Sequence, residues 1–103
     1  MTQDSVVRCS EENWSVYMIR TRHGHLYTGI TNDVERRFHS HQHASQGAKF
    51  LKGKGPLLLV FQQKVGSKSQ AARYEYRIKR LPKRCKESLV AGTAALDELV
   101  VLD

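Results

Sequence analysis

The stretch that decides the fold is WSVYMIRTRHGHLYTGIT, at residues 14–31. Residues 14–21 alternate in character and are rich in β-forming side chains, and residues 26–31 read in the same way. The segment RHGH between them contains a glycine and is typical of a turn. The stretch therefore predicts a β-hairpin, which would bring Tyr17 and Tyr27 near each other.

The residues after the hairpin predict a helix and then a third strand. Residues 31–33, TND, supply N-cap side chains for a helix over about 34–44, with Val34, Phe38 and His41 on one face. Residues 45–56 hold several glycines and lysines without periodicity, which indicates a basic loop. Residues 57–65, LLLVFQQKV, are typical of a strand.

The last third of the chain predicts helices. Residues 66–69, GSKS, end the third strand and cap a helix over 70–81. Pro82 then permits a short basic helix over 83–90, and Thr93 is a candidate cap for a last helix through Leu102. The order strand, strand, helix, strand, helix, helix predicts an α+β fold: a small, three-stranded, mainly antiparallel sheet flanked by helices.

Length and composition narrow the class of protein. A chain of 103 residues suffices for one domain, which we place at 14–103 after a flexible, polar lead-in at 1–13. Cys9 and Cys85 lack zinc-site spacing, so we interpret them as a reduced pair. Neither a signal-peptide pattern nor a membrane-spanning apolar run occurs, which favours a cytoplasmic protein with no membrane contact.

The charge is strongly basic and unevenly placed. The 17 Lys and Arg residues outnumber the 10 Asp and Glu residues and give a formal net charge of +7. Acidic residues gather toward both ends, so the middle of the chain is the basic part. Such a surface indicates a polyanionic partner, usually nucleic-acid phosphates, although a basic surface without that role remains the alternative.

Several residues could carry chemistry, but each also has a plain structural interpretation. Tyr17 and Tyr27 are favoured strand residues, although Gly29 within the strand would leave room beside them. Arg37 could hold a phosphate through two hydrogen bonds or lie solvated on its helix, and Arg36 must point about 100° away from it. Glu75 could bind Mg²⁺ or pair with a lysine one turn later.

These residues together resemble the GIY-YIG nuclease superfamily. SVY at residues 15–17 and YTG at residues 27–29 stand where the family has its two short motifs, and Arg37 and Glu75 fall at the matching later places. The resemblance covers about residues 14–82 and is greatest to small stand-alone bacterial members, through LYTGITNDVERR and YEYRIKRL. Ser15 replaces the first motif's glycine, Thr28 replaces an isoleucine, and Ile30 stands where excision-repair relatives have a lysine.

The resemblance implies a metal-dependent endonuclease that hydrolyses phosphodiester bonds in nucleic acid, DNA in preference to RNA, in DNA repair or processing. Glu75 would bind one Mg²⁺ (or Mn²⁺) ion and Arg37 would neutralise charge on the phosphate. Tyr27 would be the general base with Tyr17 supporting it. His41 would contact a phosphate or assist Tyr27, whereas a zinc site built from the helix histidines is not expected.

Further cations are predicted to bind phosphates without reading sequence. They are Arg36, Lys49, Lys52, Lys54, Lys79, Arg80, Lys83 and Arg84. Two other interpretations stay open: a nucleic-acid-binding module with this fold and little catalysis, and an interaction protein that uses the apolar stripe of the last helix. A protein partner could supply specificity, and the sequence leaves the oligomeric state open.

Overall fold

The computed structural model describes residues 13–42 and 56–102. The elements follow in the order β1 (Trp14–Arg20), β2 (Leu26–Thr31), α2 (Val34–Gln42), β3 (Leu58–Gly66), α3 (Lys68–Lys79), α4 (Lys83–Ala91) and α5 (Leu96–Leu99). Both sheet pairings are antiparallel, and the strand order is β2-β1-β3. The predicted α+β class, the three-stranded sheet and the order of elements are confirmed.

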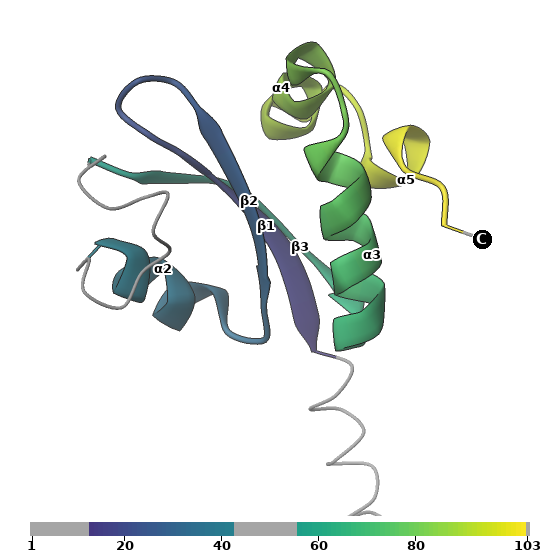
Figure 1. The fold of residues 1–103 in the computed structure, drawn as a ribbon, viewed down its shortest axis with the longest axis horizontal. Helices are drawn as coiled ribbons and strands as arrows, with labels where there is room; N and C mark the ends of the chain where they lie inside the picture. Colours follow the sequence, from purple (N-terminus) through teal and green to yellow (C-terminus); the bar gives the residue numbers. More distant parts are fainter. Residues whose placement is uncertain (1–12, 43–55, 103) are drawn as a thin grey trace, which may run out of the picture.

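The helices lie on both sides of the sheet. Figure 1 shows α2 against one face, with α3, α4 and α5 on the other. The central strand β1 is therefore covered on both sides, and the side chains at positions 16–19 are all buried. Because successive strand residues point to opposite faces, β1 supplies two different cores.

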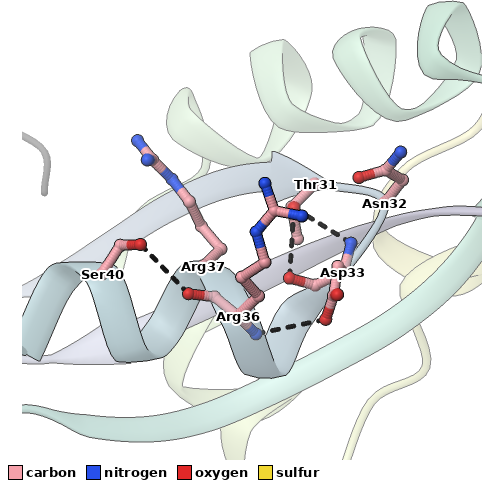
Figure 2. Close-up of a pocket in the computed structure, with 6 residues that line it drawn as sticks. All are labelled: Thr31, Asn32, Asp33, Arg36, Arg37 and Ser40. Atoms are coloured by element: carbon pink, nitrogen blue, oxygen red, sulfur yellow. Dashed lines mark hydrogen bonds between the residues drawn. The ribbon is translucent and has the colours of Figure 1, made fainter. Parts of the chain in front are cut away.

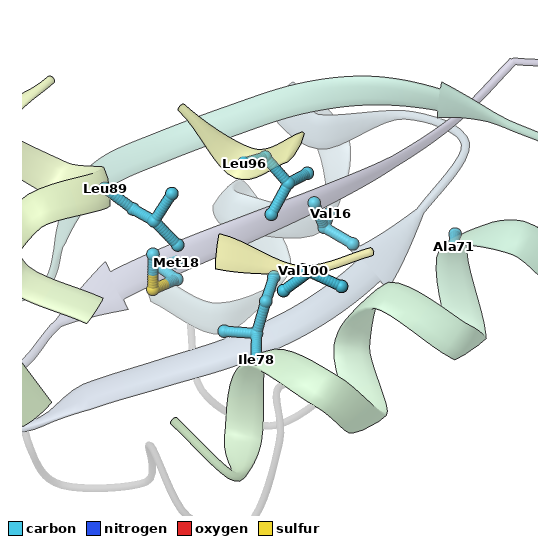
Figure 3. Packing of buried hydrophobic residues seen from close by; sticks show 7 residues of the cluster. All are labelled: Val16, Met18, Ala71, Ile78, Leu89, Leu96 and Val100. Atoms are coloured by element: carbon cyan, nitrogen blue, oxygen red, sulfur yellow. The ribbon is translucent and has the colours of Figure 1, made fainter. Parts of the chain in front are cut away.

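The larger core lies between the sheet and helices α3 to α5. Val16 and Met18 from β1 meet Ala71 and Ile78 from α3 there, and Leu89 from α4 closes one end (Figure 3). Val16, Met18, Ala71 and Ile78 have no exposed surface. This face of the sheet is purely apolar at its centre, and its burial is the main source of stability.

The smaller core lies beneath α2. Tyr17 and Ile19 from β1 pack there with Leu57, and Val34 and Phe38 of α2 cover them. The predicted face of this helix is therefore confirmed, including the burial of His41 at its end. This second core contains polar aromatic groups, which the first core lacks at its centre.

The cap of α3 lies within the predicted capping segment, residues 66–69. Ser67 is the N-cap, and its hydroxyl accepts a hydrogen bond from the Gln70 backbone N–H at 3.2 Å. The Gln70 side chain accepts in return from the Ser67 backbone N–H at 3.1 Å. This reciprocal capping box fixes the first turn two residues earlier than predicted.

The end of the chain differs from its prediction. The predicted cap at Thr93 is wrong: α5 has four residues, Leu96–Leu99, and Ala95 is its N-cap. Glu98 accepts a hydrogen bond from the Ala95 backbone N–H at 2.8 Å. Leu96 and Val100 are buried in the larger core, so the apolar stripe of this segment belongs mainly to the interior.

Two polar contacts hold α4 against the hairpin. Arg20 at the end of β1 donates two hydrogen bonds to the Glu87 carboxylate, at 2.8 and 2.7 Å. Lys83 Nζ donates to the Gly24 carbonyl oxygen in the hairpin turn at 2.9 Å. The two contacts lie about one helical turn apart on α4, so they fix both its position and its rotation.

Some predictions fall outside the described residues. They concern the lead-in, Cys9 and the basic segment with Lys49, Lys52 and Lys54. The division into a lead-in and one domain likewise stays a prediction. Cys85 is half-buried with a free thiol. Across the described parts of the chain, no helix combines the length and apolar character needed to span a bilayer.

Candidate active site

The site is built around the contact between Tyr17 and Gly29. These residues are directly opposite each other in β1 and β2, and the Tyr17 ring lies across the glycine. A Cβ atom at position 29 would lie 2.5 Å from the Tyr17 hydroxyl oxygen and 2.7 Å from Cζ. Only glycine gives this ring room, and the ring carries its hydroxyl toward β2, one of the two outer strands of the sheet.

A buried hydrogen bond anchors this hydroxyl. The Tyr17 oxygen lies 2.8 Å from Nε2 of His41, near the end of α2. Arg37, one turn earlier on α2, also donates a hydrogen bond to the Tyr17 oxygen. The Tyr17 hydroxyl donates to Nε2 or accepts from it, according to which nitrogen of the His41 ring carries the proton.

The pKa values of His41 and Tyr17 indicate which protonation states this hydrogen-bonded pair adopts. Burial, with the charge on Arg37 adding to it, lowers the pKa of His41 from 6.5 to about 4. Burial, with the nearby Tyr27 adding to it, raises the pKa of Tyr17 from 10.0 to about 12. At neutral pH the imidazole is therefore neutral and the Tyr17 phenol keeps its proton, so Tyr17 is poorly suited to be a base.

Tyr27 is the more accessible tyrosine. It lies two residues before Gly29 on the same face of β2 and is half-buried, whereas Tyr17 is 1% exposed. Its ring centroid lies 6.4 Å from that of Tyr17 and 5.5 Å from that of His41, the latter edge to face. The three rings form one cluster in which the Tyr17 hydroxyl is hydrogen-bonded to His41.

A polar pocket adjoins this cluster where β2 passes into α2. It has a volume of about 270 Å³, and Figure 2 shows its lining residues. They are Thr31, Asn32, Asp33, Arg36, Arg37 and Ser40. The Asp33 carboxylate caps α2 by accepting from the Arg36 backbone N–H at 3.1 Å. Both arginine side chains line the pocket although they are neighbours in sequence, and Arg37 also reaches Tyr17.

Glu75 approaches the same cluster from the other side of the sheet. It lies on α3, is 25% exposed, and its negative charge contributes to raising the pKa of Tyr17. Its carboxylate forms an ion pair with Lys79 at 3.2 Å, so the lysine contact that the spacing predicted is present. The site therefore gathers residues from β1, β2, α2 and α3 at the outer edge of the sheet.

The number and type of metal-binding side chains around Glu75 determine which metal ion this position suits. Within residues 13–42 and 56–102, no group of three or more His, Cys, Asp or Glu side chains could hold a metal ion. A zinc site needs three or four such ligands and is not present there. A single half-exposed carboxylate suits Mg²⁺, which keeps several waters and binds substrate phosphates.

The other predicted phosphate contacts are dispersed. Lys79 lies beside Glu75, whereas Lys83 is bound to the hairpin turn. Arg80 lies over the ring of Tyr76, 5.3 Å from its centroid, on the solvent side of α3. Arg84 is exposed on α4. Of these four, Lys79 lines a hollow beside the aromatic cluster within the described parts of the chain.

The sequence did not indicate a second hollow at the start of β2. It also has a volume of about 270 Å³ and is lined by Leu26, Tyr27, Thr28, Lys79 and Lys86. Of its lining residues, Lys86 is a cation that the sequence did not single out. The available signal was its position three residues before the buried Leu89, which places it at the border of the buried face of α4.

Residues 13–88 match the GIY-YIG catalytic domain. The chain belongs to the GIY-YIG family. This match confirms the predicted resemblance and spans every residue of the site described above. GIY-YIG is a nuclease family, so this GIY-YIG chain carries a nuclease-type domain.

Its relatives are small bacterial proteins of similar length. The GIY-YIG chain is 56% identical over 88 residues to a UPF0213 protein of Cronobacter sakazakii, covering 85% of this chain and 92% of the relative. It is 56% identical over 87 residues to UPF0213 protein YhbQ of Escherichia coli K12, covering 84% and 86%. The solution NMR structure of a UPF0213 protein from Bacillus halodurans is similar, with a TM-score of 0.50 and 42% identity over 80% of this chain and 86% of that one.

Proposed function

We propose that this protein is a divalent-metal-dependent endonuclease that hydrolyses phosphodiester bonds in nucleic acid, with DNA as the preferred substrate and DNA repair or processing as its role. One observation carries the proposal. Two tyrosines, an arginine, a buried histidine and a carboxylate from four separate elements converge at the outer edge of β2. Packing alone gives no reason to place the charged groups of Arg37 and Glu75 near the buried Tyr17 phenol.

Arg37 and Tyr27 would act on the substrate directly. Arg37 stays charged and would donate hydrogen bonds to the phosphoryl oxygens, where negative charge grows as the attacking water adds to phosphorus. Tyr27, as phenolate, would take the proton from that water while the bond from phosphorus to the leaving oxygen breaks. Tyr27 is half-buried and therefore more accessible to that water than Tyr17, which is 1% exposed.

Tyr17 and His41 would position the groups that react. Their 2.8 Å hydrogen bond, in a buried setting, fixes the Tyr17 ring across Gly29 and gives Arg37 a fixed acceptor. A guanidinium held in this way needs little reordering when a phosphate arrives. His41 would therefore assist through Tyr17, in addition to the predicted contact with a phosphate or assistance to Tyr27, whose ring it meets edge to face.

Glu75 would hold the divalent ion. When bound, Mg²⁺ or Mn²⁺ supplies Lewis-acid polarisation of the phosphoryl oxygen and of the leaving oxygen. Glu75 is 25% exposed and accessible for this purpose, and its carboxylate already pairs with one cationic group, the Lys79 ammonium. The same ion pair favours the second candidate, a nucleic-acid-binding module in which Lys79 neutralises the carboxylate and catalysis is weak.

Nicking of supercoiled plasmid DNA in the presence of Mg²⁺ or Mn²⁺ tests the proposal. Tyr27→Phe, Arg37→Ala and Glu75→Ala should each lower the nicking rate by about a hundredfold or more. Tyr76→Phe is the matched control, because this tyrosine is 60% exposed on α3 away from the cluster. Salt-sensitive binding without any product would support the binding module instead.

A labelled substrate panel then tests the choice of nucleic acid. Duplex, single-strand, flap and junction forms should be compared in DNA and in RNA at one salt concentration. Faster cleavage of RNA than of the matching DNA would contradict the DNA preference. A requirement for an added protein before any form is cleaved would support a partner that supplies specificity.

A further inference from the structure

The hollow at the start of β2 contains an unusual lysine. Lys86 is half-buried, and within residues 13–42 and 56–102 its ammonium group has no hydrogen-bond or ion-pair partner. The neighbouring lysines differ: Lys83 donates to Gly24, and Lys79 pairs with Glu75. Withdrawing a charge from water without a partner is unfavourable, so this position favours an anionic ligand.

The surroundings of Lys86 indicate which anion fits. The hollow of about 270 Å³ is also lined by Tyr27, the proposed general base, and by the half-buried Leu26. A group bound here would therefore lie next to the reacting phosphate. Apolar and aromatic walls beside two cations suit the sugar and phosphate of a nucleotide, whereas a free small anion would leave Leu26 uncovered.

The position of this hollow also defines a path for a strand. It lies at the start of β2, near Tyr27, whereas the arginine pocket lies at its end, near Asn32. Five residues of extended chain separate these points, or roughly 16 Å. The Tyr17 hydroxyl and Gly29 lie between them.

We propose that Lys86 binds the phosphate of a nucleotide flanking the scissile one, so that the substrate strand runs along the outer edge of β2 from Lys86 to Arg36. This inference rests on the proposed nuclease function. It adds a substrate-binding residue on α4 that acts on affinity and not on the chemical step. The rotation of α4 is fixed by the Glu87 and Lys83 contacts, which hold Lys86 at this edge.

The first test compares Lys86→Met with Lys64→Met, which removes the same charge from an exposed position on β3, at the opposite edge of the sheet. Binding of a fluorescent DNA oligonucleotide is measured by anisotropy without divalent metal. Lys86→Met should weaken binding about fivefold and lower the salt slope by about 0.9. Lys86→Arg should restore most of the affinity, and equal effects of Lys86→Met and Lys64→Met would overturn the inference.

The second test neutralises phosphates in the substrate. Single methylphosphonates are placed in turn at each phosphate flanking the cleaved bond. One substitution should weaken binding by the parent protein and have no further effect on Lys86→Met, since the two changes remove the same contact. If every methylphosphonate affects both proteins equally, Lys86 binds no flanking phosphate.

Cleavage kinetics separate this inference from the proposed function. With Mg²⁺, Lys86→Met should raise KM and leave kcat near the parent value. If the parent protein cleaves DNA and Lys86→Met has the same KM as the parent, the Lys86 inference is overturned while the proposed function stands. A parent protein that binds the oligonucleotide but never cleaves it contradicts the nuclease proposal and leaves the binding comparison decisive for Lys86.

Discussion

The central strand β1 supplies side chains to both faces of the sheet, but the two faces differ in their chemical character. Val16 and Met18 point toward α3 and are sealed in an apolar core, whereas Tyr17 points toward α2 and is hydrogen-bonded to His41. Val16 and Met18 have no surface exposed to water, whereas Tyr27 on the aromatic face is half-exposed to it. If the proposed function holds, the alternation of one strand separates the residues for stability from those for chemistry.

The largest expected effect tests whether the apolar face affects stability alone. Ile78→Ala should lower the free energy of unfolding by about 2–5 kcal/mol, because it empties part of a core with no exposed surface. Urea unfolding measures this loss. The folded fraction should keep the parent nicking rate at low temperature, and a slower rate per folded molecule would break the separation between the faces.

A smaller effect tests how tightly the aromatic face is packed. Gly29→Ala places a methyl group against the Tyr17 ring, which burial and His41 prevent from moving away. It should cost about 1–3 kcal/mol in unfolding free energy, and nicking should fall as the ring shifts. Thermal unfolding and nicking are measured on the same preparation.

The matching control replaces Tyr17 by a shorter side chain that has no ring. In a Tyr17→Leu background, Gly29→Ala should cost clearly less, because the atoms that it would meet at 2.5 and 2.7 Å are gone. An equal cost in both backgrounds would show that strand propensity, not the ring contact, accounts for the glycine.

The smallest effect, taken per unit of pH, distinguishes the two faces by their response to acid. The folded pKa of His41, about 4, lies below its ordinary 6.5, so the unfolded chain binds more protons between these values. The buried neutral His41 ring therefore contributes its full stabilisation above about pH 6.5. As the pH falls from 6.5 toward 4, the free energy of unfolding decreases by at most about 1.4 kcal/mol per pH unit. Urea unfolding at several pH values should show it.

His41→Gln should flatten that pH dependence, whereas His39→Gln, at an exposed position on the same helix, should not. Since the apolar face at Val16, Met18 and Ile78 carries no titratable group, variants there should shift the whole curve without changing its slope. An unchanged slope in His41→Gln would contradict the burial account of His41.

Much of this arrangement was predictable from local sequence. Alternation in residues 14–31 predicted the hairpin, and the positions of Tyr17, Tyr27 and Gly29 on one face follow from its register. The N-cap at Ser67 was predictable because capping depends on a few adjacent residues. These features need no information about distant parts of the chain.

Other features depend on long-range packing and were missed. Thr93 is a good capping residue, but burial of Leu96 and Val100 sets where α5 begins, so tertiary packing overrides the local preference. The partner of His41 depends on how far the Tyr17 ring extends across Gly29. Lys86 acquires its position only after α4 docks on the hairpin turn, a contact between residues far apart in sequence.

The outer position of β2 has a consequence for the behaviour of the protein in concentrated solution. Among the described strands, β2 pairs with β1 alone, and an unpaired strand edge can add a strand from another copy. Lys79, Lys86, Arg36 and Arg37 line hollows at its two ends. Because like charges repel, the cations proposed to hold a substrate also discourage edge-to-edge self-association.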